Sequence, residues 1–165
     1  MVKLGIDIGL KNYAYCLLDD EQEVLEWECV DLTQESKCGS THYKGKFDMI
    51  HVSKTLFEKF KYLFEKYDKG RISVNIENQI PTGSNGIIMK TIQGMTTQIL
   101  TVMGVTDMNY VGGSKKLKKF DVPQKTYKER KKGSILVVRE LVGEALDRFG
   151  KKKDYVCDAY LLCLF

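Results

Sequence analysis

The stretch Leu4-Gly5-Ile6-Asp7-Ile8 places a single carboxylate inside an apolar run near the start of the chain. A short run of this kind is typical of a buried β-strand. Burial of a carboxylate costs free energy unless the charge has a partner, and a metal ion is the most effective partner. Asp7 is therefore the first candidate for a functional site, although an acid at the surface end of a strand would fit the same pattern.

Outward from this strand, the spacing of apolar residues predicts the order β-β-β-α-β-α-β-α-α. Three closely spaced strands at the start predict an antiparallel meander within a mixed five-stranded sheet flanked by helices, which is an α/β architecture. The 165 residues are expected to form one domain spanning 1–165. The predicted strands are 4–8, 13–18, 24–32, 71–77 and 108–111; the predicted helices are 49–67, 87–104, one from Thr126 or Ser134 to Phe149, and 154–165; the predicted loops are 33–47 and 114–125.

Three further acids interrupt apolar segments. Glu77 ends a predicted strand, and Asp154 and Asp158 are spaced i, i+4 on the last predicted helix, so they share one face. Four acids from two strands and one helix could converge at one end of the sheet, where hard oxygen ligands suit Mg²⁺ or Mn²⁺. Two such ions about 3.5–4 Å apart can activate water and stabilise a leaving oxygen in phosphodiester cleavage. Alternatively, Glu77 ends its strand at the surface and Asp154 favours the positive end of its helix.

The positive charge is concentrated in one segment. Residues 113–153 hold fourteen lysines and arginines against five acids, whereas the rest of the chain has an excess of acids. Such a cationic surface suits a polyanion such as nucleic acid. A solvated lysine-rich face would give the same count.

The cysteines and the hydropathy of the sequence predict an intracellular compartment for the protein. The five cysteines are odd in number and lack C-x-x-C spacing, so reduced thiols in an intracellular compartment are expected. Two histidines are too few for an obvious zinc site. No apolar run approaches the roughly 20 residues that cross a bilayer, so no membrane association is expected. The N-terminus runs directly into a strand without a transit peptide, which favours a viral replication site in host cytoplasm over a mitochondrion.

Four stretches resemble, in order, the motifs of the poxviral and fungal-mitochondrial branch of RuvC-like Holliday-junction resolvases. The first is Gly5-Ile6-Asp7-Ile8-Gly9-Leu10-Lys11-Asn12, similar to a first-strand motif with Asp, Gly and Lys-Asn. The second is Val74-Asn75-Ile76-Glu77-Asn78-Gln79-Ile80-Pro81, similar to Ile/Leu-Glu-Arg-Gln before a turn with proline. The third is Tyr127-Lys128-Glu129-Arg130-Lys131-Lys132, similar to Tyr-Arg-x-Arg-Lys-Lys. The fourth is Lys152-Lys153-Asp154-Tyr155-Val156-Cys157-Asp158-Ala159, similar to Lys-Lys-Asp-Asp-x-x-Asp-Ser/Ala at the start of the final helix.

The resemblance spans residues 5–159 and implies a ribonuclease H-like fold, a homodimer, and symmetric nicking of four-way DNA junctions with Mg²⁺, for which Mn²⁺ would substitute. It implies catalytic roles for Asp7, Glu77 and Asp158. It also implies that Lys131, with Lys132 as a close rival, stabilises charge near the scissile phosphate. The residues expected to contact DNA are Lys11, Asn12, Gln79, Lys115, Lys116, Lys118, Lys119, Lys128, Arg130 and Lys132.

One residue departs from the family pattern. Tyr155 stands where the family has an acid three residues before the final Asp. Either Asp154 takes over as catalytic acid and metal ligand, or the site has one ligand fewer and binds a second ion weakly or not at all.

Three other functions remain as hypotheses. A sugar-kinase or actin-like ATPase also begins with Asp-x-Gly, but it needs two large lobes. A catalytically silent DNA-binding protein would explain Tyr155. A nuclease acting on RNA/DNA hybrids would share the fold. For a dimer, the Met- and Thr-rich helix 87–104 is the predicted interface.

Overall fold

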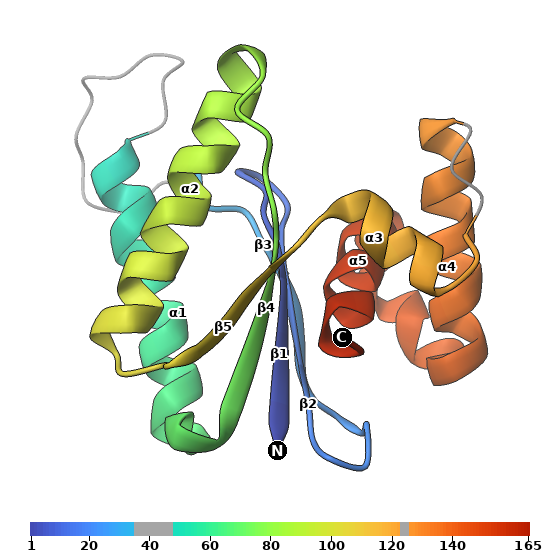
Figure 1. Cartoon of the computed structure of the whole chain (residues 1–165), viewed down its shortest axis with the longest axis horizontal. Coiled ribbons are helices and arrows are strands. Elements are labelled where there is room, and N and C mark those ends of the chain that lie inside the picture. Colours follow the sequence, from blue (N-terminus) through green and yellow to red (C-terminus); the bar gives the residue numbers. More distant parts are fainter. Residues whose placement is uncertain (35–47, 123–125) are drawn as a thin grey trace.

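The computed structural model describes residues 1–34, 48–122 and 126–165, except for the side chain of Lys69. The element order matches the predicted succession of strands and helices, except for one additional helix at residues 113–119 (Figure 1). The elements are β1 (Val2–Asp7), β2 (Tyr13–Leu18), β3 (Val24–Val30), α1 (Met49–Lys66), the 3-10 helix η1 (Lys69–Arg71), β4 (Ile72–Glu77), α2 (Gly83–Val102), β5 (Asp107–Val111), α3 (Gly113–Lys119), α4 (Tyr127–Val142), the 3-10 segment η2 (Gly143–Lys152) and α5 (Lys153–Cys163).

The five strands form one mixed sheet, as predicted, and their order in the sheet is β3-β2-β1-β4-β5. β1, β2 and β3 pair antiparallel, whereas β1 pairs with β4, and β4 with β5, in parallel. Because β1 and β4 run in the same direction, their carboxyl ends meet at one edge. Asp7 and Glu77 are the last residues of these two strands.

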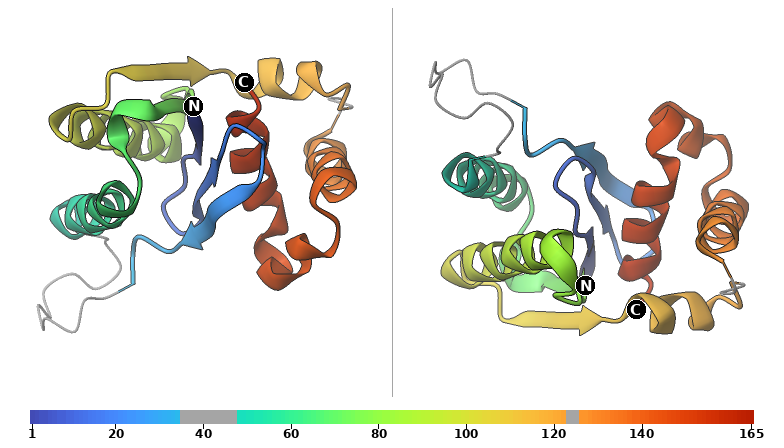
Figure 2. Two further views of the ribbon diagram at one scale, coloured as in Figure 1. Left: turned by 90° about the horizontal axis from the view of Figure 1, so that it is seen from below. Right: turned by 90° about the horizontal axis from the view of Figure 1, so that it is seen from above.

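Helices cover both faces of the sheet (Figure 2). The face toward α1 and α2 carries the larger apolar cluster, which includes Leu4, Ile6 and Phe60. The face toward α5 carries a second cluster built around Trp27 and the apolar side of α5, and α4 packs over α5. Alternate residues of β2 divide between the two clusters, because successive side chains of a strand point to opposite faces.

α5 lies unusually close to β1. A Cβ added to Gly5 would be 2.1 Å from the carbonyl oxygen of Ala159, so only glycine allows this approach. Trp27 Nε1 donates to the Val156 carbonyl at 2.8 Å, and Asn75 Nδ2 donates to the Leu162 carbonyl at 3.1 Å. These contacts fix α5 across the sheet, and with it the two acids that it carries.

Three predicted boundaries were wrong. α2 begins at Gly83 rather than at residue 87, because the turn glycines enter the helix: Gly86 lies against the Ile80 carbonyl, where a Cβ would be only 2.6 Å away. The first part of the predicted basic loop 114–125 belongs to α3 (Gly113–Lys119), which buries Leu117. α4 ends at Val142 rather than at Phe149, because the next residue, Gly143, has a positive φ of 60°.

The remaining expectations about local structure concern the helix start, the thiols and the loops. Thr126, one of two proposed caps, begins α4 with a capping box to Glu129. The cysteines in the described part of the chain, Cys16, Cys29, Cys157 and Cys163, are free, in line with the predicted reduced thiols. Among the described helices, none is both long and apolar enough to cross a bilayer. Most of the predicted loop 33–47, and residues 123–125, lie outside the described residues.

Candidate active site

Two carboxylates meet at the carboxyl end of the parallel strands. Asp7 ends β1 with a relative exposure of 6%, and Glu77 ends the neighbouring β4. Their side chains share a hydrogen bond. Gln79 Nε2 donates to Glu77 Oε2 at 3.3 Å, so the predicted DNA contact Gln79 also steadies one of these acids. The backbone approaches closely as well, because a Cβ on Gly113 would be 2.8 Å from Glu77 Oε1.

α5 adds Asp158 to this pair of acids. Side chains of two other helices, α3 and α4, contact the Asp158 carboxylate. Ser134 of α4, itself buried, donates from its hydroxyl to Asp158 Oδ1 at 3.1 Å. Lys116 of α3 lies 3.1 Å from the same oxygen. Asp158 therefore connects α3, α4 and α5 at the end of the sheet.

Lys116 was predicted on an exposed loop as a phosphate contact, and this prediction needs correcting. Its side chain is 2% exposed, and its Nζ lies 3.4 Å from Glu77 Oε1 as well as 3.1 Å from Asp158 Oδ1. The reason is α3, which turns Lys116 and Leu117 inward. The sequence offered little signal, since four of the five residues 115–119 are lysines. Lys116 is thus a site residue, with its ammonium between two carboxylates.

The electrostatics follow from this arrangement. Burial, and next the charge of Glu77, raise the pKa of Asp7 well above its ordinary value. Burial acts to raise the pKa of Glu77, but the hydrogen bond from Asp7 and the Lys116 ammonium outweigh it and lower that pKa. Burial raises the pKa of Asp158 even though Lys116 opposes the shift. Burial acts to lower the pKa of Lys116, but the surrounding acids raise it, so the ammonium keeps its charge.

Asp154 has a different partner. Its carboxylate forms an ion pair with Lys131 of α4, and its side chain is 12% exposed. The Lys131 Nζ also lies 4.3 Å from the ring centroid of Tyr155 and 4.7 Å from that of Tyr127. The structure therefore brings Asp7, Glu77 and Asp158 together around Lys116, and holds Asp154 separately with Lys131.

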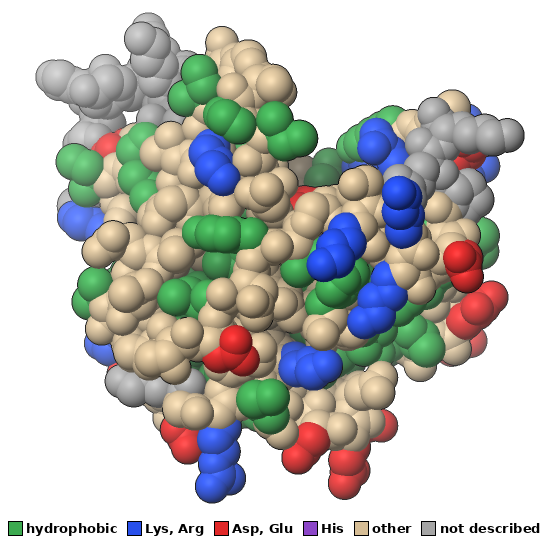
Figure 3. Space-filling view, in the orientation of Figure 1, with side chains coloured by type: hydrophobic (Ala, Val, Ile, Leu, Met, Phe, Trp, Pro, Cys, Tyr) green, Lys and Arg blue, Asp and Glu red, His purple; other side chains and the backbone are tan. Residues whose placement is uncertain are grey.

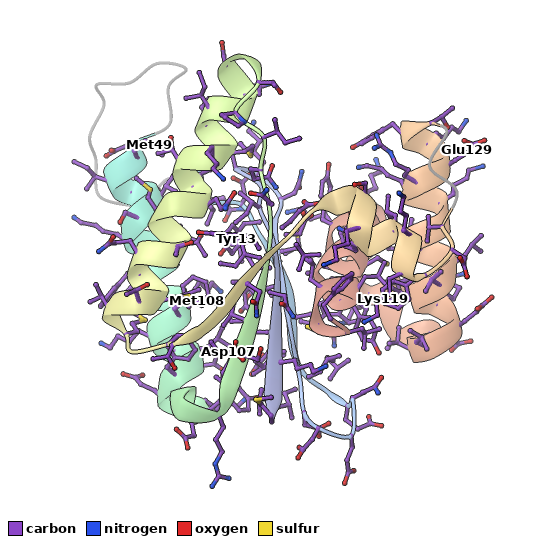
Figure 4. The ribbon with its side chains drawn as sticks, viewed as in Figure 1. Tyr13, Met49, Asp107, Met108, Lys119 and Glu129 are labelled. Carbon is purple, nitrogen blue, oxygen red and sulfur yellow. The ribbon has the colours of Figure 1, made fainter. Side chains whose placement is uncertain are left out.

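The other predicted DNA contacts lie around this site. Lys11 and Asn12 follow β1 in the connection to β2, with Lys11 exposed. Lysine side chains gather on the surface over α3, beside a notch between the start of α2 and the α3–α4 side (Figure 3). Lys119 and Glu129 mark that side in Figure 4, whereas Met49 lies on α1 at the opposite side. Among the predicted DNA contacts in residues 113–153, the exposed ones are Lys115, Lys118, Lys119, Lys128, Arg130 and Lys132.

The donor set of the central site fits a hard divalent cation by its chemistry. Asp7, Glu77 and Asp158 supply only carboxylate oxygens, and the raised pKa values of Asp7 and Asp158 show two acids that a cation would help to ionise. The three carboxylates do not form a ready-made metal site as they stand: among residues 1–34, 48–122 and 126–165, no three acids, histidines or cysteines are placed to hold an ion together. The Lys116 ammonium lies between Glu77 and Asp158 instead.

Solved structures resemble this chain over nearly its whole length. Thermus thermophilus RuvC aligns with a TM-score of 0.66 and 17% identity, covering 99% of this chain and 92% of RuvC. The yeast mitochondrial Holliday junction resolvase Ydc2 aligns with a TM-score of 0.61 and 19% identity, covering 98% of this chain and 75% of Ydc2. The fowlpox virus Holliday junction resolvase aligns with a TM-score of 0.59 and 18% identity, covering 99% and 95%.

The chain has the RuvC-like resolvase fold. The resemblance inferred from the four sequence motifs is thereby confirmed at the level of the fold, and so is the ribonuclease H-like architecture with its mixed five-stranded sheet. Neither a protein-family model nor a curated protein sequence matches the chain. Within the RuvC-like fold, the acids Asp7, Glu77 and Asp158 stand together at the carboxyl ends of β1 and β4 and on α5.

Proposed function

We propose that this chain is a structure-selective DNA endonuclease that resolves four-way junctions by metal-dependent phosphodiester hydrolysis. The observation that carries the proposal is the convergence of Asp7, Glu77 and Asp158 at one end of a RuvC-like sheet, beside a lysine-rich surface. A solved structure of Thermus thermophilus RuvC, which has the same fold, contains a Holliday junction substrate. A junction therefore suits this fold, and the cationic surface suits a polyanion.

The three central carboxylates would hold Mg²⁺, with Mn²⁺ as a substitute. When bound, the ion supplies Lewis-acid activation of water and stabilisation of the leaving oxygen. Ser134 orients the Asp158 carboxylate through its hydroxyl, and Gln79 orients that of Glu77. Lys116 neutralises two of the acids in the protein alone.

DNA contacts are proposed on both sides of the acids. Lys11 and Asn12 lie beside the carboxyl end of β1, and the exposed cations of α3 and α4 extend the surface. Lysines on such a surface contact phosphates without reading sequence, so binding should weaken steeply with salt. The cations of α3 and α4 proposed as DNA contacts are Lys115, Lys118, Lys119, Lys128, Arg130 and Lys132.

Symmetric nicking requires two active sites, which a twofold homodimer would place on opposed strands. We propose α2 as the interface, as the sequence suggested. Ile87 and Val102 of this helix expose 58% and 72% of their surface, and Tyr110 of the edge strand β5 exposes 52%. An edge strand beside a helix with exposed apolar side chains offers a surface that a second copy could cover.

The proposal is tested by incubating a labelled four-way junction, a linear duplex of the same sequence and an RNA/DNA hybrid with the chain and Mg²⁺. Paired nicks are expected on the junction alone, and none from Asp7→Asn. Faster cutting of the hybrid would support the hybrid nuclease instead. Tight junction binding without cutting in Mg²⁺ or Mn²⁺ would support a catalytically silent binding protein.

A further inference from the structure

The side chain of Lys131 is enclosed by three groups, here named the lysine clamp: the carboxylate of Asp154 and the rings of Tyr127 and Tyr155. The Asp154 carboxylate pairs with the ammonium, and the two ring centroids lie 4.7 Å and 4.3 Å from Nζ. An ammonium within about 6 Å of an aromatic centroid is attracted by the ring face. The side chain of Lys131 as a whole is still 26% exposed.

The clamp belongs to the contact between α4 and α5. Lys131 contacts Asp154, and three residues further along α4 Ser134 contacts Asp158, four residues further along α5. Asp154 and Asp158 are about one helical turn apart, which is roughly 6 Å along the axis. Asp154 is therefore assigned to the lysine by the packing of the two helices, while Asp158 faces the central acids.

Tyr155 completes this separation. It lies three residues before Asp158, on the adjoining turn of α5, and its ring faces the Lys131 ammonium. A carboxylate at that position would be available to a cation near Asp158, whereas an aromatic face attracts the lysine instead. Both Asp154 and Tyr155 thus hold the Lys131 ammonium against α5, about one helical turn from the contact between Ser134 and Asp158.

We infer that Asp154 is a positioning residue for Lys131 rather than a metal ligand. Lys131, held in the clamp, then provides the second positive charge at the scissile phosphate. A site with two metal ions would hold its second divalent cation there. This inference rests on the proposed nuclease function. In it, Asp7, Glu77 and Asp158 hold one divalent ion. Lys131 binds a non-bridging phosphate oxygen with its exposed side, and no bond to the lysine forms or breaks.

Metal binding by the protein alone tests the assignment of Asp154. Bound Mn²⁺ is counted from the loss of the free-ion electron paramagnetic resonance signal during titration of the wild-type chain, Asp154→Asn, Asp158→Asn and Asp147→Asn. Asp147 is the matched control, because it is an exposed acid that pairs with Lys153 and Arg139 outside the site. One Mn²⁺ is expected for the wild-type chain, Asp154→Asn and Asp147→Asn, and at least tenfold weaker binding for Asp158→Asn. Equal weakening by Asp154→Asn and Asp158→Asn would overturn the inference.

Substitution of Tyr155 tests the number of bound ions by adding a carboxylate instead of removing one. Tyr155→Asp should add a second Mn²⁺ per chain, because it places a carboxylate one turn before Asp158. Tyr155→Phe keeps the ring face and should retain one ion. A second ion already present in the wild-type chain would contradict the inference.

The phosphate contact of Lys131 is measured from the salt dependence of junction binding in EDTA, where no hydrolysis occurs. Each lost phosphate contact should reduce the slope of log affinity against log salt by about 0.9. Lys131→Gln should show this reduction, and Lys61→Gln, an exposed lysine of α1, should not. An unchanged slope for Lys131→Gln would refute the phosphate role.

These measurements separate the two proposals. The wild-type chain could cut no junction although the Mn²⁺ titrations and the salt dependence of junction binding give the results expected for the clamp. In that case the nuclease proposal fails and the clamp assignment stands. If the chain cuts junctions but Asp154→Asn raises the Mg²⁺ concentration for half-maximal cutting, the clamp assignment fails and the nuclease proposal stands. The inference expects Asp154→Asn to lower the maximal rate at least tenfold with that Mg²⁺ concentration unchanged.

Discussion

Removal of the Lys116 ammonium should destabilise the metal-free protein strongly. Its Nζ lies 3.1 Å and 3.4 Å from two carboxylates, and the side chain is 2% exposed. At an effective dielectric constant of about 20, each contact contributes roughly 5 kcal/mol of Coulomb attraction, most of which offsets desolvation. Deletion of one partner leaves unpaired buried charge and typically costs about 3–5 kcal/mol. Lys116→Met keeps the apolar stem, so its unfolding free energy should fall by about 3 kcal/mol or more at pH 7.

The assay is urea unfolding in EDTA, followed by the fluorescence of the single tryptophan, Trp27, which is buried. Lys118→Met is the matched control, because Lys118 is an exposed lysine on the same helix, and its effect should stay within about 0.5 kcal/mol. Saturating Mg²⁺ should restore more stability to Lys116→Met than to the wild-type chain, since the ion replaces the missing charge. Equal urea midpoints for Lys116→Met and Lys118→Met would refute the buried ion-pair arrangement.

Three further substitutions test the packing and electrostatics of the site. Asp7→Asn should stabilise the metal-free protein at pH 7, because folding raises the pKa of Asp7 and ionisation of this acid therefore favours the unfolded chain above about pH 3.8; each unit by which folding raises this pKa costs about 1.4 kcal/mol at higher pH. The gain should disappear below about pH 4 in urea unfolding measured across pH, and a gain that persists there would contradict the pKa shift. Gly5→Ala should cost about 1–3 kcal/mol in thermal unfolding, since its Cβ would meet the Ala159 carbonyl at 2.1 Å, and unchanged stability would show that α5 lies further from β1. Gly113→Ala should push on Glu77 Oε1, 2.8 Å from the new Cβ, and weaken Mn²⁺ binding about tenfold in a titration; unchanged affinity would place Glu77 outside the metal site.

The sheet and the central acids could be predicted because local pattern determines them. Asp7 and Glu77 end apolar strands, and the parallel pairing of β1 with β4 then brings them together. Asp158 follows from helical spacing on the apolar α5. In each case one acid interrupts an apolar segment, and this pattern can be recognised in the sequence without knowledge of tertiary contacts.

The sequence does not predict in the same way which lysines are buried at the site and which are exposed. Lys116 is one of four lysines within five residues, and only the packing of α3 decides which of them turns inward. Lys131 was selected by family resemblance, but its enclosure by Tyr127 and Tyr155 depends on the register between α4 and α5. The sequence shows Tyr155 only as a departure from the family motif, whereas the structure shows that its ring contacts the Lys131 ammonium.

The central claim is that two active sites of this chain cut opposed strands of one junction. A supercoiled plasmid that extrudes a cruciform measures this directly, because two cuts within one binding event convert the plasmid to a linear molecule. We predict a linear product with Mg²⁺ from the wild-type chain and none from Asp7→Asn. Nicked circles without linear product, or cutting that ignores the cruciform, would contradict the assignment as a junction resolvase.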